Sequence, residues 1–244
     1  MKVLITGGNS AVGRSLAENL LTDGHKVVSF DIHRPDQLNS QINYIQDDVL
    51  DFDALFQASK GCHAGIHLAI RAGNSSVTDI ISVNVMGAHN FFRSTSIRKF
   101  QMSILAGSAP AHLIPAKSDN DILLRTDKDD VYDLSKKLQE IIAQDYHSHG
   151  LPVQCLRFGH VVRGKEQTTL DSKTPLHDFY YCRGGWVALE DIVKVCTSAL
   201  SSAADKSFRP YNIIGSKSGR GRFNVSKTER RFGISLTYDF SEYD

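Results

Sequence analysis

The stretch that decides the fold is Val3-Leu4-Ile5-Thr6-Gly7-Gly8-Asn9-Ser10-Ala11-Val12-Gly13. Its first three residues form a short apolar run, which is typical of a buried parallel strand. After the glycine-rich turn, Leu16 and Leu20 continue an apolar stripe at helical spacing, and Gly24 is placed to end that helix. A second apolar run, Lys26–Phe30, completes a strand–turn–helix–strand unit, and Asp31 stands at its end.

The glycine-rich turn predicts a dinucleotide site. Such a turn lets the backbone come close to a pyrophosphate, and the helix N-terminus offers free N–H groups and a positive dipole end to the anion. A tight turn without a ligand is the alternative, but an acid at the end of the next strand favours the dinucleotide. The loop residues expected to bind it are Gly7, Gly8, Asn9, Ser10, Ala11, Val12 and Gly13.

Asp31 favours NAD over NADP as the cofactor. A carboxylate at this point accepts hydrogen bonds from the adenosine ribose hydroxyls and repels a 2′-phosphate. Arg34 keeps NADP open as the less favoured choice, since a nearby arginine can pair with that phosphate. Asp48 follows the next expected strand and is placed to hydrogen-bond adenine, although it also fits a plain loop aspartate.

Strands and helices continue to alternate along the chain, which predicts an α/β fold with a doubly wound, Rossmann-like parallel sheet. The further strands are expected at residues 42–45, 65–69, 103–106 and 153–158, and the further helices at 52–59, 83–98 and 131–147. No repeat or linker interrupts residues 1–244. We therefore expect a single domain with a small C-terminal substrate lobe, formed mainly by residues 160–185 and 215–244.

The composition is that of an ordinary cytoplasmic protein. A net charge of +1 gives no general attraction to nucleic acid or membranes, and the basic stretch 217–231 contains Gly and Ser, as a solvated loop does. We expect no secretory leader and no membrane span, because no apolar run reaches the roughly 18 residues that a span needs. The four widely spaced cysteines predict reduced thiols, and no residue spacing predicts a metal site.

Tyr132 and Lys136 lie one helical turn apart in an expected helix and therefore share a face. Free tyrosine has a pKa of about 10 and is a poor base at neutral pH. A neighbouring ammonium favours the phenolate and lowers that pKa, so the tyrosine can exchange a proton with a substrate oxygen. Such a pair is common on solvated helix faces, and the preceding dinucleotide unit is what favours a catalytic interpretation.

Ser108 is the third candidate catalytic residue. It lies at the carboxyl end of an expected strand, where ligands of open parallel sheets bind, and its hydroxyl can bind the reacting oxygen. A hydrolase nucleophile at the same serine is disfavoured, because Ala106-Gly107-Ser108-Ala109-Pro110 lacks the Gly-x-Ser-x-Gly elbow.

In this order of landmarks the chain resembles the NAD-dependent epimerase/dehydratase family, the extended short-chain dehydrogenases. The resemblance covers nearly the whole chain. The residues that carry it are the Thr6–Gly13 loop, Asp31, Asp48-Val49, His67-Leu68-Ala69, Asn84-Val85-Met86-Gly87, Ser108, Tyr132 with Lys136 and Glu140, Arg157-Phe158-Gly159, Trp186–Val193 and Tyr211–Gly215.

The resemblance implies a role for each matched residue. Tyr132 would be the acid/base, Lys136 would bind the nicotinamide ribose and tune the tyrosine, and Ser108 would orient the substrate. Asn84 would act as a structural link beneath the cofactor. The remaining cofactor contacts implied are Val49, Leu68, Ala69, Ile70 and Phe158. Ser10 and Gly107 depart from the family, which usually has glycine and serine there, and His112-Leu113 replaces a common Tyr-Gly; these departures put the substrate pocket in doubt.

The resemblance and the short C-terminal lobe together favour a small, sugar-derived substrate. The compact length, with Arg183 shortly before Trp186, is similar to uronate dehydrogenases, and Arg183 would then pair with a substrate carboxylate. A surface arginine is the alternative. The expected substrate contacts are Ser108, Ala109 and Arg183, although Ala109 and Pro110 offer no polar side chain to a sugar.

We therefore predict an NAD-dependent oxidoreductase that transfers a hydride at a hydroxyl or carbonyl carbon of a small polar, sugar-derived substrate, with a hexuronic acid as one candidate. A sugar epimerase/dehydratase, which returns the hydride, is the alternative within the same machinery. A non-catalytic NAD-sensing regulator is the alternative of another class, disfavoured because Tyr132 and Lys136 are both present. The family resemblance also implies a homodimer formed through the helices Val83–Arg98 and Val131–His147.

Overall fold

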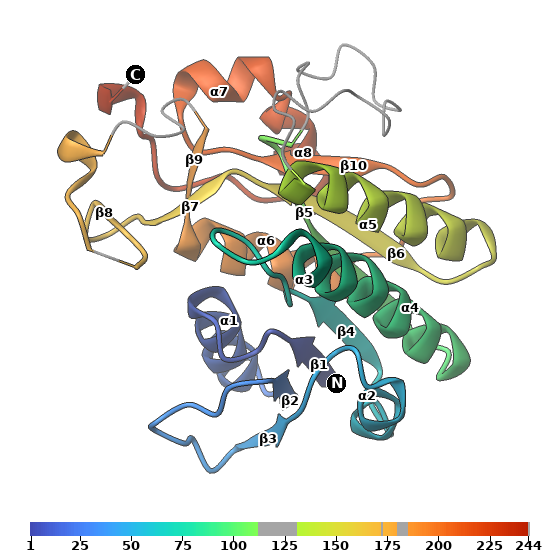
Figure 1. Cartoon of the computed structure of the whole chain (residues 1–244). Coiled ribbons are helices and arrows are strands. Elements are labelled where there is room, and N and C mark those ends of the chain that lie inside the picture. Colours follow the sequence, from blue (N-terminus) through green and yellow to red (C-terminus); the bar gives the residue numbers. More distant parts are fainter. Residues whose placement is uncertain (112–130, 172, 180–184, 244) are drawn as a thin grey trace.

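The computed structural model describes residues 1–111, 131–171, 173–179 and 185–243. A parallel sheet runs through the middle of the molecule, as the alternation of strands and helices predicts (Figure 1). Its strand order is β10-β6-β5-β4-β1-β2-β3. The strands are β1 Lys2–Thr6, β2 Lys26–Asp31, β3 Ile42–Gln46, β4 Ala64–His67, β5 Met102–Ser108, β6 Val153–Phe158 and β10 Pro210–Ile213.

Helices cover both faces of this sheet. On one face α1 Ala11–Thr22, α6 Leu189–Ser201 and α8 Val225–Phe232 pack in one core cluster with the strands. On the other face α2 Phe52–Ala58, α4 Gly87–Ile97 and α5 Val131–Ser148 form a second cluster. None of the helices in the described part of the chain combines the length and the hydropathy that crossing a bilayer requires.

The order of the strands creates a crevice beside β1. The chain leaves β1 for β2 on one side, whereas β4, β5 and β6 are added on the other side. The connections that follow β1 and β4 therefore lead to helices on opposite faces of the sheet, α1 after β1 and α4 after β4. In open parallel sheets, this reversal point is where ligands bind.

The expected helix at residues 83–98 is not continuous. The structure has a short helix α3 Val77–Ile81, a π-helical turn Ser82–Met86 and only then α4. The backbone N–H of Gly87 donates to both Ser82 O and Val83 O, which marks the end of the wider turn. The helical segment thus begins earlier than expected and contains a one-turn irregularity at Asn84.

A small three-stranded sheet stands apart from the main one. Its order is β8-β7-β9, with β7 His160–Arg163, β8 Thr168–Thr169 and β9 Trp186–Ala188, and a 3₁₀ turn at Leu176–Asp178 precedes β9. Trp186 is fully buried there. The rings of Phe240 and Tyr243 pack against it with centroid separations of 6.1 and 5.4 Å.

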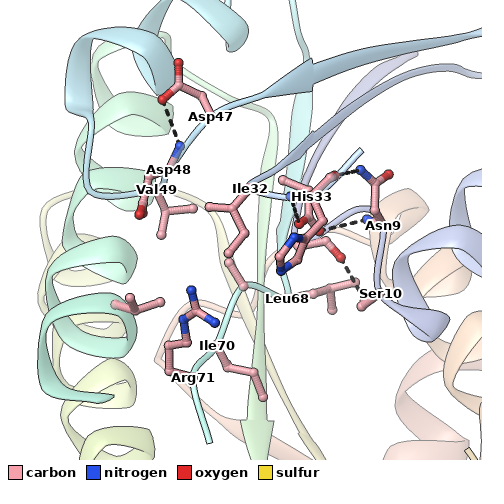
Figure 2. Close-up of a pocket in the computed structure, with 14 residues that line it drawn as sticks. Asn9, Ser10, Ile32, His33, Asp47, Asp48, Val49, Leu68, Ile70 and Arg71 are labelled. Carbon is pink, nitrogen blue, oxygen red and sulfur yellow. Dashed lines mark hydrogen bonds between the residues drawn. The ribbon is translucent and has the colours of Figure 1, made fainter. Parts of the chain in front are cut away.

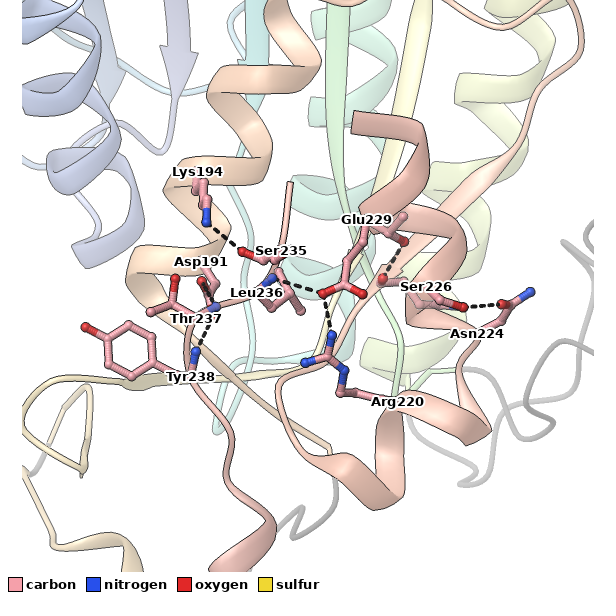
Figure 3. Close-up of polar contacts among 12 residues, drawn as sticks. Asp191, Lys194, Arg220, Asn224, Ser226, Glu229, Ser235, Leu236, Thr237 and Tyr238 are labelled. Atoms are coloured by element: carbon pink, nitrogen blue, oxygen red, sulfur yellow. Dashed lines mark hydrogen bonds and ion pairs between the residues drawn. The ribbon is translucent and has the colours of Figure 1, made fainter. Parts of the chain in front are cut away.

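The segment that follows α8 ties the small sheet to the main one (Figure 3). Asp191 of α6 accepts backbone hydrogen bonds from Thr237 at 2.8 Å and Tyr238 at 3.1 Å. Lys194 donates to Ser235 O at 2.6 Å. Residues 215–243 therefore divide between two cores, since α8 and its loops join the main cluster whereas Phe240 joins the small one.

Candidate dinucleotide and catalytic site

Two glycines of the first turn leave no room for a side chain. Gly7 has a φ of +70°, and a Cβ built on it would lie 2.7 Å from the backbone nitrogen of Ala69. A Cβ on Gly13 would lie 2.5 Å from Gly7 O. The turn is therefore packed tightly against the loop after β4 and the start of α1. This bare backbone at a helix N-terminus fits a dinucleotide pyrophosphate.

Ser10 explains how the turn accommodates a residue other than glycine. Its hydroxyl accepts from Gly13 N at 3.1 Å and donates to Gly7 O at 2.8 Å, which makes it the N-cap of α1. The side chain is thus folded onto the loop itself. A capping serine stabilises the helix start by about 1 kcal/mol.

At the carboxyl end of β1, the reversal point of the strand order forms a cleft of about 280 Å³ (Figure 2). Its walls come from the ends of β1, β2, β3 and β4 and from the π turn. The lining residues are Gly7, Asn9, Ser10, Asp31, Ile32, His33, Asp47, Asp48, Val49, Leu68, Ala69, Ile70, Arg71 and Val83. Of the described residues, no three with metal-binding side chains come close enough together to hold a metal ion.

The Asp31 carboxylate is fixed at the edge of this cleft. Its Oδ2 accepts from Asn9 N at 3.0 Å, and its Oδ1 accepts from His33 N at 3.0 Å. Each carboxylate oxygen keeps a further acceptor site, as binding of a ribose diol requires. Asn9 is held in turn by Ser29, whose hydroxyl donates to Asn9 Oδ1 at 2.8 Å. Arg34 is exposed and is not part of the cleft lining.

Most of the residues expected to bind the adenosine half of the cofactor line this one cleft, from Gly7 to Ile70. Four residues of the glycine-rich segment are outside the lining: Gly8, Ala11, Val12 and Gly13. The sequence interpretation missed Ile32, His33, Asp47, Arg71 and Val83. Four of these residues are adjacent in sequence to a predicted site residue, and His33 lies two positions after Asp31, so extending each predicted site by one or two residues would have found them.

Lys136 of α5 is buried close to the carboxyl end of β5. Its Nζ donates to Ala106 O at 2.6 Å and to Gln139 Oε1 at 2.9 Å. Burial lowers the pKa of its amine to about 8, partly opposed by Cys155 and by the Glu140 carboxylate. An amine with this pKa still carries a positive charge at neutral pH.

Tyr132 and Ser108 lie near the same end of the sheet. Tyr132 is half-buried and stands one turn before Lys136 on α5. Ser108 is the last residue of β5, two positions after the carbonyl that binds Lys136, and it pairs in register with Phe158 of β6. The three residues implied as catalytic therefore come from two neighbouring elements that pack together.

The other two expected substrate contacts are Ala109 and Arg183. Ala109 is fully buried in the main core, and its N–H donates to Phe158 O at 2.8 Å. Its side chain belongs to the main core cluster, and a contact between Ala109 and a substrate stays a prediction. Arg183, like His112 and Leu113, lies outside the described residues.

Asn84, in the π turn, joins the cofactor loop to the catalytic helix. Its Oδ1 accepts from Arg71 N at 2.7 Å, and its Nδ2 donates to Arg71 O at 3.0 Å and to Ser135 Oγ at 2.8 Å. Asn84 has no exposed surface. Replacing it would leave several buried polar groups unpaired, which usually costs about 1–3 kcal/mol for each group.

A buried ion pair lies beside Gly107, the residue before Ser108. Arg157 Nη2 and Glu140 Oε2 are 2.7 Å apart, and their side chains are 4% and 0% exposed. Burial alone would lower the pKa of Arg157, but the Glu140 carboxylate raises it above its usual value. A Cβ on Gly107 would lie 3.0 Å from Glu140 Oε1, so a glycine here gives the carboxylate space beside β5.

His67, at the end of β4, is fully enclosed and uncharged. Its Nδ1 is 2.7 Å from Thr6 Oγ1, and its ring stacks on Phe91 with a centroid separation of 5.1 Å. Burial, together with the nearby Lys136, lowers the pKa of His67 to about 3. At neutral pH this imidazole therefore adds no second positive charge beside the amine.

A match to the sequence model of a known family identifies the family of this chain. The model of the NAD dependent epimerase/dehydratase family matches residues 3–177. The chain is a member of this family. The family is NAD-dependent, and the glycine turn and Asp31 fit that cofactor.

Curated relatives match shorter parts of the chain. The 2-alkyl-3-oxoalkanoate reductase of Stenotrophomonas maltophilia is 33% identical over 92 residues, which is 37% of this chain and 28% of the reductase. The 3 beta-hydroxysteroid dehydrogenase/isomerase of Mycobacterium tuberculosis is 36% identical over 103 residues, or 38% and 28% of the two chains. This chain covers between 10% and 57% of the curated relatives it matches.

Solved structures match almost the whole fold. An epimerase of Methanothermobacter thermautotrophicus has a TM-score of 0.79 at 17% identity, covering 99% of this chain and 89% of the epimerase. The uronate dehydrogenase of Agrobacterium tumefaciens, complexed with NAD, has a TM-score of 0.75 at 17% identity and covers 99% and 86%. These likenesses confirm the Rossmann-like fold.

Proposed function

We propose that this chain transfers a hydride between NAD and a hydroxyl- or carbonyl-bearing carbon of a small, polar, sugar-derived substrate. The observation that carries the proposal is the buried amine of Lys136, held at the end of β5 one helical turn from Tyr132. Burying a charged amine in the core lowers the stability of the fold. The presence of such an amine near the proposed dinucleotide cleft therefore favours a catalytic role for Lys136.

In this proposal the chain's own residues manage the proton. NAD, when bound, supplies the hydride acceptor or donor. Lys136 lowers the pKa of Tyr132 through its charge, and Tyr132 takes the proton from the substrate hydroxyl during oxidation. Ser108 donates a hydrogen bond to the same oxygen and orients it. In reduction Tyr132 returns the proton.

We propose a hexuronic acid as the specific substrate class, bound by the lobe of residues 160–185 and 215–244 with Arg183 as its carboxylate partner. The support is the short C-terminal lobe and the fold shared with a protein named uronate dehydrogenase. The relatives named as an oxoalkanoate reductase and a steroid dehydrogenase point to carbonyl substrates of lower polarity. The substrate panel therefore includes both kinds.

The deciding experiment mixes the pure protein with NAD and, in separate assays, glucuronate, galacturonate, neutral aldoses and an apolar secondary alcohol, and follows NADH absorbance. We expect a signal with the uronates. Tyr132→Phe should abolish it while NAD binding persists, because only the proton transfer is lost. Full turnover by Tyr132→Phe on a confirmed substrate would exclude this mechanism.

The remaining outcomes separate the alternatives. A signal with the apolar alcohol alone would exclude the sugar assignment. Silence across the panel, together with NAD that stays bound through purification, would favour an epimerase, which regenerates its own cofactor. NAD binding without turnover of any substrate, together with a stable partner protein, would favour the regulatory alternative.

We also propose that the protein is a homodimer that pairs through α4 and α5. The two helices pack side by side (Figure 1). Both carry exposed large apolar side chains, and Met86, the last residue of the π turn, precedes α4 directly. Met86, Ile97, Leu134 and Ile141 are each 39–52% exposed. An apolar surface of this kind is typical of a face that a second subunit covers.

A further inference from the structure

Gln139 is a buried polar side chain that belongs neither to the three candidate catalytic residues nor to the lining of the cofactor cleft. It lies on α5, one turn after Lys136, and has no exposed surface. Its Oε1 accepts from Lys136 Nζ at 2.9 Å, and its Nε2 donates to Asn84 O at 2.8 Å. A single amide therefore bridges the catalytic amine and the π turn.

The chemistry of its two partners fixes the orientation of this amide. The ammonium can only donate and the Asn84 carbonyl can only accept. Rotating the amide by half a turn would oppose donor to donor and acceptor to acceptor. Gln139 is thus locked in one orientation, with its oxygen toward Lys136.

We propose that Gln139 is a positioning residue that holds the Lys136 ammonium in place and keeps it charged. With Ala106 O and Gln139 Oε1 accepting two of its three N–H groups, one N–H remains for the ribose or the tyrosine. This role rests on the proposed function, in which Lys136 tunes Tyr132.

The same amide also connects the cofactor loop to the amine. Asn84 clamps the backbone of Arg71, which lines the dinucleotide cleft, and the Asn84 carbonyl holds Gln139. The chain of contacts runs from the cleft through the π turn to Lys136 without a gap. The position of the amine is therefore set by the backbone that contacts the cofactor.

Lys136 has titratable or charged neighbours on three elements, and they bear on any change of its pKa. The groups concerned are Tyr132 and Glu140 on α5, Cys155 and Arg157 on β6, and His67 on β4. Cys155 and Glu140 act to raise the pKa of Lys136, although Glu140 is also paired with Arg157 and burial raises the pKa of Cys155 itself. Gln139 is the uncharged side chain that contacts the amine directly.

The test measures the pKa of Lys136 itself by NMR titration of protein labelled with ¹³C at the lysine ε-carbon. The signal is assigned by its loss in Lys136→Arg. Gln139→Leu removes the acceptor and should lower the pKa by about one unit, the value of a hydrogen bond to a charged group. Gln139→Glu places a carboxylate there and should raise it.

Two controls separate this effect from damage to the fold. Gln154 of β6 is equally buried, but its amide bonds Ala203 O, so Gln154→Leu and Gln154→Glu should leave the Lys136 signal unmoved. If Gln139→Glu does not fold, Gln139→Met, which has nearly the same shape and no acceptor oxygen, repeats the downward shift.

The outcomes are distinct from those of the function assay. Opposite shifts in the two Gln139 variants support the inference, and an unchanged Lys136 pKa in folded Gln139→Leu and Gln139→Met overturns it. Where a substrate is known, the alkaline limb of the kcat profile should move in the same directions. Opposite NMR shifts with an unmoved kcat profile would support the action of Gln139 on Lys136 and contradict the proposed role of Lys136.

Discussion

Near the candidate catalytic residues, the buried cationic side chains differ in their charge at neutral pH. Lys136 stays charged at neutral pH, whereas His67, also buried nearby, stays neutral. Glu140 and Arg157 cancel one another beside Gly107. The amine is therefore the cation of this described cluster that has no ion-pair partner within the group, and such a charge favours a phenolate placed beside it.

His67 gives the protein a predictable sensitivity to acid. Its pKa of about 3 in the folded state lies below the value of 6.5 for an unperturbed histidine. The unfolded chain therefore binds a proton that the folded one refuses, and stability is lost as pH falls from about 6.5 toward the folded pKa. The free energy of unfolding should fall by about 1.4 kcal/mol per pH unit in this window from His67 alone.

The measurement is urea unfolding of wild type and His67→Gln between about pH 6 and pH 4. The variant should lose stability less steeply, because glutamine does not titrate. His149→Gln, at an exposed site, serves as the matched control and should follow the wild-type slope. Parallel curves for wild type and His67→Gln would contradict the burial of a neutral imidazole.

At the scale of elements, the small sheet depends on a distant part of the chain. Phe240 is fully buried against Trp186 and Gly215, well outside the strands it stabilises. Phe240→Ala should lower the free energy of unfolding by about 3–5 kcal/mol. Trp186 is the single tryptophan of the sequence, so its fluorescence should shift to the red as water reaches it.

Phe232→Ala is the matched control for this substitution. Phe232 is buried in the main core beside Tyr211, at a ring separation of 5.2 Å. Its loss should reduce stability by a similar amount and leave the native emission of Trp186 in place. Equal emission changes in both variants would show that the small sheet has no core of its own.

The sequence predicts the strands of the main sheet well because their apolar runs reflect burial on both faces, as in Val3–Ile5 and Ile104–Ala106. The glycine turn, Asp31 and the Tyr132–Lys136 spacing are also local signals. Gln139 could not be found in this way, since its meaning depends on Asn84, which is distant in sequence and close only in the fold. Likewise, the spacing of apolar residues in the sequence does not predict the π turn.

At the scale of the whole molecule, the outer surface of α4 and α5 predicts a second subunit. Leu134 and Ile141 lie on the outer side of α5 and are 48% and 39% exposed. Leu134→Glu together with Ile141→Glu should convert a dimer to monomers, because charges at the centre of an apolar interface are poorly solvated. Sedimentation equilibrium measures the mass directly.

Leu38→Glu provides the control for the dimer experiment. Leu38 is as exposed as Leu134 but lies in the loop between β2 and β3, on another part of the molecule. Its substitution should leave the mass unchanged. A wild-type protein that sediments as a monomer at every concentration would exclude the proposed pairing.

The π turn at Ser82–Met86 has a genetic consequence. Such a turn accommodates one more residue than a regular α-helix would. Loss of a single codon here would let the segment relax to a continuous α-helix with little rotation of the residues on either side, because the wide turn already absorbs the extra residue. The residues of the turn itself would be repositioned, and Asn84 is one of them. One in-frame deletion would therefore disturb its contacts with Arg71, Ser135 and Gln139 while leaving the flanking helices in place.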